Sequence, residues 1–436
     1  MEKKKFSVKL DTVLKLPNEV VTCRSGDDFV VISPKDGNWL VLSEEQLQIF
    51  ELFRSGKTVG EVVSKADKGA CLILLKQIVA RNFTERDLSV VDRNARAMFY
   101  LTYDCNLKCG HCYMFSRRRR ADMLSVGEYR SIFATLKQYG VKEVTFSGGE
   151  PLMRSDFWDI IQEACDVGLI PKVFSNGTLW DDADIERAKA FAVKVQISID
   201  GVDETSCAAV RGAHVFEKAK DVAVKLAKAG VDVEIATTPI LENMEEIEHG
   251  YSAFVKDLQE KAGGKIRFKV TLSLLPGRNL SAMSPDEKKD YEQRGIRLYS
   301  ISNPGGSHIP FFEEYRKGIG RIVCGLGRLA FSPDGFVYVC SQLDFLPAIG
   351  NVREVGVVQL LEEAKKRITA ASVDNTIPCR ECPLRHICGG GCRAERYQYV
   401  SDSENVPSVH KPCTEKYKQK LLQMMVQTTK ECYTWE

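Results

Sequence analysis

The sequence predicts an α/β protein built around a partial (β/α)6 TIM-like barrel, with a winged-helix-like domain before it and a cysteine-rich domain after it. Three observations lead to this fold. Six β-rich segments alternate with helical patterns between residues 97 and 275. The first 93 residues combine β-rich runs with three short helical patterns. From residue 276 onward the alternation stops and spaced cysteines appear instead.

Composition narrows the class of protein. The 436 residues carry a net charge of +2, so no basic surface suggests a nucleic-acid partner. The longest apolar run, residues 70–75, is far shorter than a membrane span, and the N-terminus has no signal-peptide core. We therefore expect a cytoplasmic protein without a membrane partner. In a reducing compartment, clustered cysteines indicate metal ligands rather than disulfides.

Residues 1–93 form the first predicted domain. The runs 29–33 and 38–42 are rich in β-formers and are separated by Pro-Lys-Asp-Gly, which is typical of a hairpin. Ser43 is a predicted N-cap for a helix that ends at Gly56, and two more helical patterns follow. Strands followed by three short helices predict a winged-helix-like arrangement.

Residues 97–275 form the predicted barrel. Helical patterns with one apolar face, such as that of residues 125–140, separate the strands and predict a parallel sheet. In such a barrel the reacting groups lie at the carboxyl ends of the strands. The predicted strands are residues 98–103, 142–147, 171–175, 194–200, 231–238 and 265–273.

A cysteine motif directly follows the first predicted strand. Cys105, Cys109 and Cys112 have the spacing C-x3-C-x2-C. Zinc and cubane iron–sulfur sites both need four ligands, and this motif supplies three. Polar residues follow the later strands as well. Gly148 and Gly149 would let the backbone approach a ligand closely, and Glu150 would accept from an ammonium group.

These motifs together resemble the radical S-adenosylmethionine (radical SAM) superfamily. The resemblance implies a [4Fe–4S] cluster on the three cysteines, with S-adenosylmethionine (AdoMet) on the open iron. An electron from a low-potential donor would then cleave AdoMet to methionine and a 5′-deoxyadenosyl radical, which abstracts a hydrogen atom from the substrate. No catalytic side chain is assigned beyond the cluster. The AdoMet-binding residues expected are Gly148, Gly149, Glu150, Pro151, Ser175, Asn176, Gln196, Ser198, Asp200 and Arg211.

For Arg211, binding of the AdoMet carboxylate and an ordinary ion pair are equally good expectations.

A second cysteine array lies near the C-terminus. It resembles the SPASM domain, an extension of one group of radical SAM enzymes that carries auxiliary iron–sulfur clusters. By resemblance, one cluster would be held by Cys379, Cys382, Cys388 and Cys413, and another by Cys324, Cys340 and Cys392. The second set has three ligands, and its fourth stays open. This domain is expected over residues 321–436, after a bridging region over 276–320.

Enzymes of this architecture resemble maturases that modify peptides. Residues 1–93 resemble a RiPP recognition element, which binds the leader of a ribosomal precursor peptide as an added strand. The expected product is an intramolecular thioether, carbon–carbon or carbon–oxygen crosslink.

Three alternatives remain. Anaerobic sulfatase maturases commonly have Asp after the cysteine that matches Cys340, where this sequence has Ser341. A radical SAM enzyme acting on a small molecule is the second alternative. An iron–sulfur DNA-binding regulator is the third, and the near-zero net charge opposes it.

Overall fold

The chain forms two compact units that do not follow its linear order. One unit contains Met1–Asp92, Gly306–Leu326 and Lys366–Glu436, and the other contains Arg93–Gly305 and Gly327–Lys365. The computed structural model describes residues 8–84, 96–112, 114, 123–271, 274, 277–281, 283–302, 328–341, 348–391, 397–399, 407–410 and 413–432. The predicted boundaries at residues 93, 97, 275, 320 and 321 stay predictions, and each unit is described here by itself.

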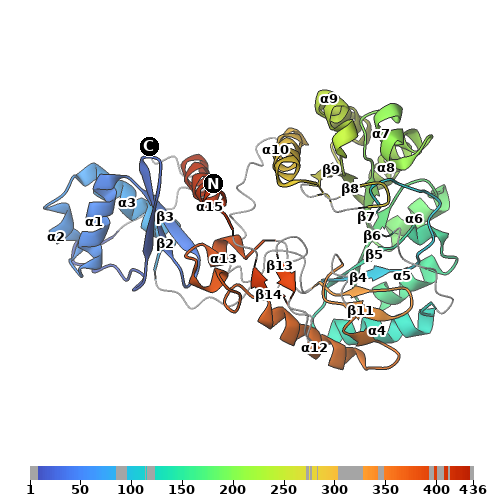
Figure 1. The fold of residues 1–436 in the computed structure, drawn as a ribbon, viewed down its shortest axis with the longest axis horizontal. Helices are drawn as coiled ribbons and strands as arrows, with labels where there is room; N and C mark the ends of the chain where they lie inside the picture. Colours follow the sequence, from blue (N-terminus) through green and yellow to red (C-terminus); the bar gives the residue numbers. More distant parts are fainter. Residues whose placement is uncertain are drawn as a thin grey trace. The chain divides into compact units, whose positions relative to one another are not determined.

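The second unit has a mostly parallel sheet at its centre (Figure 1). Six strands lie in chain order and are parallel to their neighbours, which confirms the predicted α/β class. The strands are β4 (Arg96–Tyr100), β5 (Glu143–Ser147), β6 (Ile170–Ser175), β7 (Lys194–Ser198), β8 (Asp232–Thr237) and β9 (Ile266–Val270). Each lies inside or within two residues of a predicted strand, because each is a short run of β-formers flanked by helical patterns.

Helices connect these strands and cover the sheet. A capping box at Ser125 starts the first, where the Ser125 hydroxyl accepts from the Glu128 N–H. None of the helices in the described ranges is both long and apolar enough to cross a bilayer. The helices are α4 (Val126–Gln138), α5 (Phe157–Asp166), α6 (Asp182–Ala190), α7 (Glu204–Arg211), α8 (Phe216–Ala229), α9 (Met244–Ala262) and α10 (Pro285–Ser302).

Three short strands that the sequence did not predict extend this sheet beyond β4. They are β10 (Ala330–Phe331), β11 (Phe336–Tyr338) and β12 (Gly350–Asn351), with α12 (Val357–Ala370) after them. β10 is parallel to β4, and Phe331 stacks on Phe99 with ring centroids 4.5 Å apart. Phe99 also contacts Phe133 of α4 edge to face. The aromatic core therefore fixes β4, the strand that leads into the cysteine motif.

The first unit begins with an antiparallel sheet in the order β1-β2-β3. Its strands are β1 (Val21–Ser25), β2 (Asp28–Ser33) and β3 (Asn38–Leu42), followed by α1 (Glu44–Arg54), α2 (Val59–Val63) and α3 (Lys68–Ala80). The predicted order of strands and then three helices is confirmed. Val31, Leu40 and Leu42 face these helices and pack against Phe50 and Leu74. One face of the sheet is thus covered by the N-terminal helices.

Segments from the C-terminal part of the chain cover the other face. Val30, Ile32 and Trp39 pack against Leu384 and Met425. Trp39 also donates through Nε1 to the Thr429 hydroxyl at 3.2 Å. The segments are η4 (Cys379–Glu381), α13 (Arg385–Cys388) and α15 (Glu415–Cys432), and a hairpin of β13 (Tyr397–Tyr399) and β14 (Pro407–His410) also belongs to this unit.

One buried histidine ties the cysteine-bearing segment to the sheet. His386 lies between Cys382 and Cys388, and its Nδ1 lies 2.7 Å from the Pro34 carbonyl in the β2–β3 connection. Its Nε2 lies 2.7 Å from Asp374 Oδ1. Because a carbonyl and a carboxylate both accept, both ring nitrogens donate.

We expect replacement of this histidine to loosen the hairpin. In His386→Ala, two buried acceptors lose their donor, which should lower the free energy of unfolding by about 1–3 kcal/mol. Hydrogen exchange of residues 33–38 should speed up before the rest of the sheet is affected. The exposed His249 on α9 gives a control, and His249→Ala should leave both quantities unchanged. Equal exchange rates in the two variants would contradict the role given to His386.

Candidate active site

The cysteine motif lies on a loop that follows β4, at the carboxyl end of the sheet. The loop is closed on itself by a hydrogen bond from the Cys112 N–H to the Cys109 carbonyl at 3.3 Å. It is anchored to α7 by the Gly110 N–H, which donates to the Val210 carbonyl at 3.0 Å. Burial raises the pKa of the Cys105 and Cys109 thiols, and the neighbouring cysteine charges raise both further. The three sulfur atoms are therefore close enough to influence one another.

The glycine turn after β5 is locked to this loop through its backbone. The Gly149 N–H donates to the Thr102 carbonyl and the Glu150 N–H to the Asp104 carbonyl, both at 2.8 Å. A Cβ atom on Gly149 would lie 1.9 Å from the Asp104 oxygen, and one on Gly148 would lie 2.4 Å from the Thr102 oxygen. Only glycine fits at either position, and Gly148 also has a φ of 141°.

The Glu150 carboxyl is fully buried and is surrounded by neutral donors. It accepts from the Ser175 hydroxyl and the Asn176 N–H, both at 2.8 Å, and from the Leu152 N–H at 3.4 Å. Burial raises the pKa of Glu150 to about 7, and these donors oppose the rise. Pro151 starts the one-turn helix η2 (Pro151–Met153), whose N-cap is Glu150.

The loop after β6 also contacts the cysteine loop. Asn176 donates through Nδ2 to Asn106 Oδ1 at 2.8 Å, and Asn106 in turn donates to the Thr178 hydroxyl at 2.8 Å. Asn106 lies between the first two cysteines, so the structure adds it and Thr178 to the predicted set. Their signal in the sequence was too weak to separate them from ordinary loop residues.

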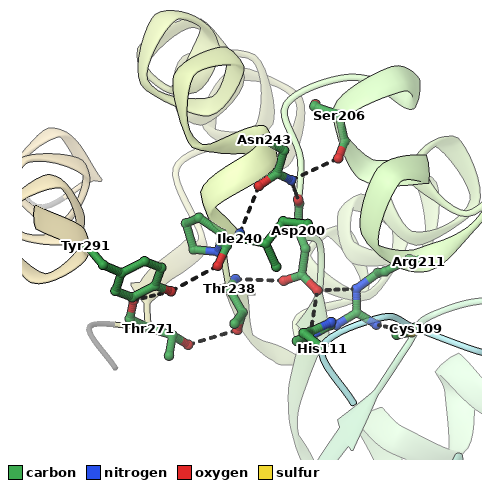
Figure 2. A network of polar contacts seen from close by, with 11 residues as sticks. Cys109, His111, Asp200, Ser206, Arg211, Thr238, Ile240, Asn243, Thr271 and Tyr291 are labelled. Carbon is green, nitrogen blue, oxygen red and sulfur yellow. Dashed lines mark hydrogen bonds and ion pairs between the residues drawn. The ribbon is translucent and has the colours of Figure 1, made fainter. Parts of the chain in front are cut away.

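The predicted polar residues of the fourth barrel strand, β7, divide into two groups. Gln196 is buried, and its Oε1 has no hydrogen-bond partner among the described residues, whereas Ser198 is partly exposed. Asp200 follows the strand and is fully buried. Figure 2 shows that Asp200 lies between Arg211 of α7 and His111 of the cysteine loop. Arg211 donates through Nε to Asp200 Oδ2 at 2.6 Å, and His111 Nε2 lies 3.3 Å from the same oxygen.

His111 was not among the predicted site residues. It was read only as part of the cysteine spacing, and burial lowers the pKa of its imidazole. Thr238 and Asn243 also belong to this network. The Thr238 N–H donates to Asp200 Oδ1 at 2.7 Å, and Asn243 donates to the carbonyls of Asp200 and Ser206.

The residues of the cysteine loop fit an iron–sulfur cluster. Three mutually close thiols lie on one short loop, beside a buried acid that has no cation of its own. No three potential ligand side chains of the described ranges converge on a single metal ion. A cubane does not require such convergence, because each thiolate binds a different iron atom.

The C-terminal cysteines are described in part. Cys379, Cys382, Cys388 and Cys413 carry free thiols, as does the buried Cys340. The Cys382 N–H donates to the Cys379 carbonyl at 2.9 Å. Burial raises the pKa of Cys382, and the charges of Cys413 and Cys388 add to the rise. Cys324 and Cys392 lie outside the described residues, so the grouping of Cys324, Cys340 and Cys392 stays a prediction.

This fold and loop agree with a family comparison. Residues 99–252 match the model of the Radical SAM superfamily, so this part of the chain is a radical SAM domain.

Two curated relatives match most of the chain. Mycofactocin maturase MftC from Mycolicibacterium smegmatis is 28% identical over 320 residues, which cover 68% of this chain and 77% of that protein. The AdoMet-dependent heme synthase of Nitratidesulfovibrio vulgaris is 28% identical over 337 residues, which cover 69% of this chain and 88% of that protein.

A solved structure has the same fold. SuiB from Streptococcus suis superposes with a TM-score of 0.55 at 13% identity, covering 92% of this chain and 99% of SuiB. SuiB has also been solved with S-adenosylmethionine and with its precursor peptide SuiA. At this identity the likeness concerns the fold alone.

The glycine turn gives a direct test of the loop arrangement. Gly149→Ala places a methyl group into the Asp104 carbonyl, so we expect a loss of about 1–3 kcal/mol in stability and a large loss of iron after reconstitution. The matched control is Gly127→Ala on α4, where an added Cβ meets no atom within 4 Å. Iron analysis and thermal unfolding of both variants measure the two effects. Full iron content in Gly149→Ala would show that the turn does not position the loop.

Proposed function

We propose that this protein is a radical SAM peptide maturase. It cleaves AdoMet reductively, abstracts a hydrogen atom from a ribosomal precursor peptide and forms an intramolecular thioether, carbon–carbon or carbon–oxygen crosslink. One observation carries the radical chemistry. In a radical SAM domain, the three-cysteine loop lies against the buried Glu150 carboxyl, which accepts only from neutral donors. Such an acid is suited to bind the ammonium group of AdoMet.

The residues of the site divide the work. Cys105, Cys109 and Cys112 would hold a [4Fe–4S] cluster, which supplies an electron to AdoMet when bound. Glu150 would accept the amino group, with Ser175 and Asn176 fixing the orientation of its carboxyl. Gly148 and Gly149 leave room for the ligand, and Pro151 directs the chain away. Gln196 and Ser198 would contact AdoMet from β7, where the Gln196 Oε1 acceptor has no partner among the described residues.

Auxiliary clusters are part of the proposal. Cys379, Cys382, Cys388 and Cys413 would hold one, with Cys388 Sγ 3.6 Å from the Tyr417 hydroxyl. The second would be held by Cys324, Cys340 and Cys392. An external low-potential protein would donate electrons, and oxidation of the peptide would return electrons through the auxiliary clusters.

A peptide is the favoured substrate for two reasons. The relative MftC is a maturase, and SuiB, which shares the fold, has been solved with a precursor peptide. The three-stranded N-terminal sheet also has two edges, β1 and β3, to which an extended leader could add as a strand. At β3 the Val41 N–H donates to Gln77 Oε1, so a strand added there would replace this side chain as the acceptor. We place the protein in the cytoplasm, where leader-bearing precursors are made.

A small-molecule substrate is the second candidate. It is favoured by the similarity to the heme synthase, which matches as much of this chain as MftC does. The sulfatase-maturase alternative has less support, because Ser341 follows Cys340 where those enzymes commonly have Asp. Nucleic acid is not proposed as a partner, since the net charge is only +2.

The substrate class is tested by anaerobic co-expression with a short peptide encoded beside the gene. We expect the peptide to lose two hydrogen atoms in mass, and tandem fragmentation should locate the new bond. Cys109→Ala should abolish both this change and 5′-deoxyadenosine formation, because the radical chemistry needs the cluster. The exposed outer-helix variant Arg130→Met should keep both. An unchanged peptide mass with intact 5′-deoxyadenosine formation would favour the small-molecule alternative.

The buried acid predicts a pH dependence of AdoMet binding. The pKa of Glu150 is about 7, so the carboxyl is largely protonated below this pH and ionised above it. Only the ionised form attracts an ammonium, so AdoMet affinity should increase several-fold as the pH rises through about 7. Calorimetry across this range measures the effect. Glu150→Gln should bind AdoMet weakly and without this dependence, and an equally steep profile in that variant would assign the titration elsewhere.

A further inference from the structure

The strongest unexplained feature is the buried polar network at the ends of β7 and β8, shown in Figure 2. Its centre is Asp200, which accepts from the Arg211 Nε at 2.6 Å and from the Thr238 N–H at 2.7 Å, with His111 Nε2 at 3.3 Å. The Asp200 side chain has no exposed surface, and the Arg211 side chain is 9% exposed. Such a pair is costly to bury, and its geometry is therefore held firmly.

The network also holds Asp200 from the barrel side. Thr238 and Thr271 share a hydrogen bond between their hydroxyls at 2.9 Å. Tyr291 of α10 donates to the carbonyls of Pro239 and Thr271. Asp200 thus sits on a scaffold built from β7, β8, the end of β9 and α10, and Arg211 takes its position from Asp200.

The second arm of the Arg211 guanidinium faces the cysteine loop. Nη1 lies 4.0 Å from Cys109 Sγ. The preceding residue, Val210, accepts the Gly110 N–H through its carbonyl at 3.0 Å. The end of α7 therefore grips the loop twice, once through its backbone and once through a charged side chain that points at a sulfur atom.

We propose that Arg211, oriented by Asp200, is a positioning residue that donates to the Cys109 thiolate and thereby raises the reduction potential of the cluster bound there. The inference rests on the proposed cluster at Cys105, Cys109 and Cys112 and deepens the account of that site. Reduction adds one negative charge that the ligand sulfurs share, and a charge-assisted N–H donor at a sulfur stabilises the reduced state more than the oxidised one. Hydrogen bonds to cluster sulfurs are a known determinant of potential.

Two roles for Arg211 now compete, and they change different quantities. If Arg211 tunes the cluster, its loss changes the reduction potential. If it binds the AdoMet carboxylate, as the resemblance implied, its loss weakens AdoMet binding and leaves the potential of the AdoMet-free protein unchanged. The same protein samples can therefore separate the roles.

The experiment is a redox titration of the full-length reconstituted protein without AdoMet, followed by EPR. The signal of this cluster is the part that disappears in Cys109→Ala. In Arg211→Met we expect a more negative midpoint, equivalent to about a tenfold smaller ratio of reduced to oxidised cluster at a fixed potential, or ~59 mV for one electron. Asp200→Asn should move the midpoint in the opposite direction, because the guanidinium then loses its counter-charge.

The matched control removes an arginine from a carboxylate pair on the outer surface. Arg130 pairs with Glu163, and its side chain is 68% exposed. Arg130→Met should leave the midpoint unchanged. AdoMet affinity is measured on the same four proteins by calorimetry.

Each outcome decides the proposal. Opposite shifts in Arg211→Met and Asp200→Asn, with the control unmoved, support it. An unchanged midpoint in Arg211→Met overturns it, and weakened AdoMet binding there would assign Arg211 to the carboxylate. If Arg211→Met does not bind iron, Arg211→Lys and Asp200→Asn decide, and unchanged midpoints in both overturn it. Absence of any Cys109-dependent signal in the unmutated protein would instead mean that the proposed function fails.

Discussion

The site depends on a set of backbone hydrogen bonds between two loops. The Gly149 and Glu150 N–H groups donate to the Thr102 and Asp104 carbonyls. The strands before these loops are already in register, with Tyr100 opposite Ser147. Because peptide groups hold the loops, the thiols and the Glu150 carboxyl remain free for ligands. The glycines follow from this contact, since any side chain at positions 148 or 149 would enter the facing backbone.

The two buried acids of the site are neutralised in different ways. Asp200 is paired with Arg211, so its charge is already balanced within the protein. Glu150 accepts only from neutral groups, and its pKa is raised to about 7. A cationic ligand would gain most from Glu150, because binding would replace the missing counter-charge. The structure thus distinguishes an acid available to a ligand from an acid that orients an arginine, although both follow barrel strands.

The sequence revealed the parts of this protein whose signals are local. The six barrel strands are short β-rich runs between helical patterns, and the predicted ranges agree with β4 to β9. The cysteine loop and the Gly-Gly-Glu turn were found because spacing and residue type are specific to their chemistry. β10 to β12 were missed because they are two or three residues long and form only by pairing with β4. His111 and Asn106 were missed because their roles depend on partners from other loops.

Packing over long sequence distances explains why residues 1–93 do not describe a complete unit. The central strands of the N-terminal sheet are apolar on both faces, with Val31 toward the N-terminal helices and Val30 and Ile32 on the opposite side. A small sheet with one solvated face would alternate apolar and polar residues. The second face is covered by Leu384, Ile387 and α15, which come from the C-terminal cysteine segment. An N-terminal fragment alone would expose this face to water. The sheet proposed to bind the leader and the segment proposed to hold an auxiliary cluster therefore share one hydrophobic core.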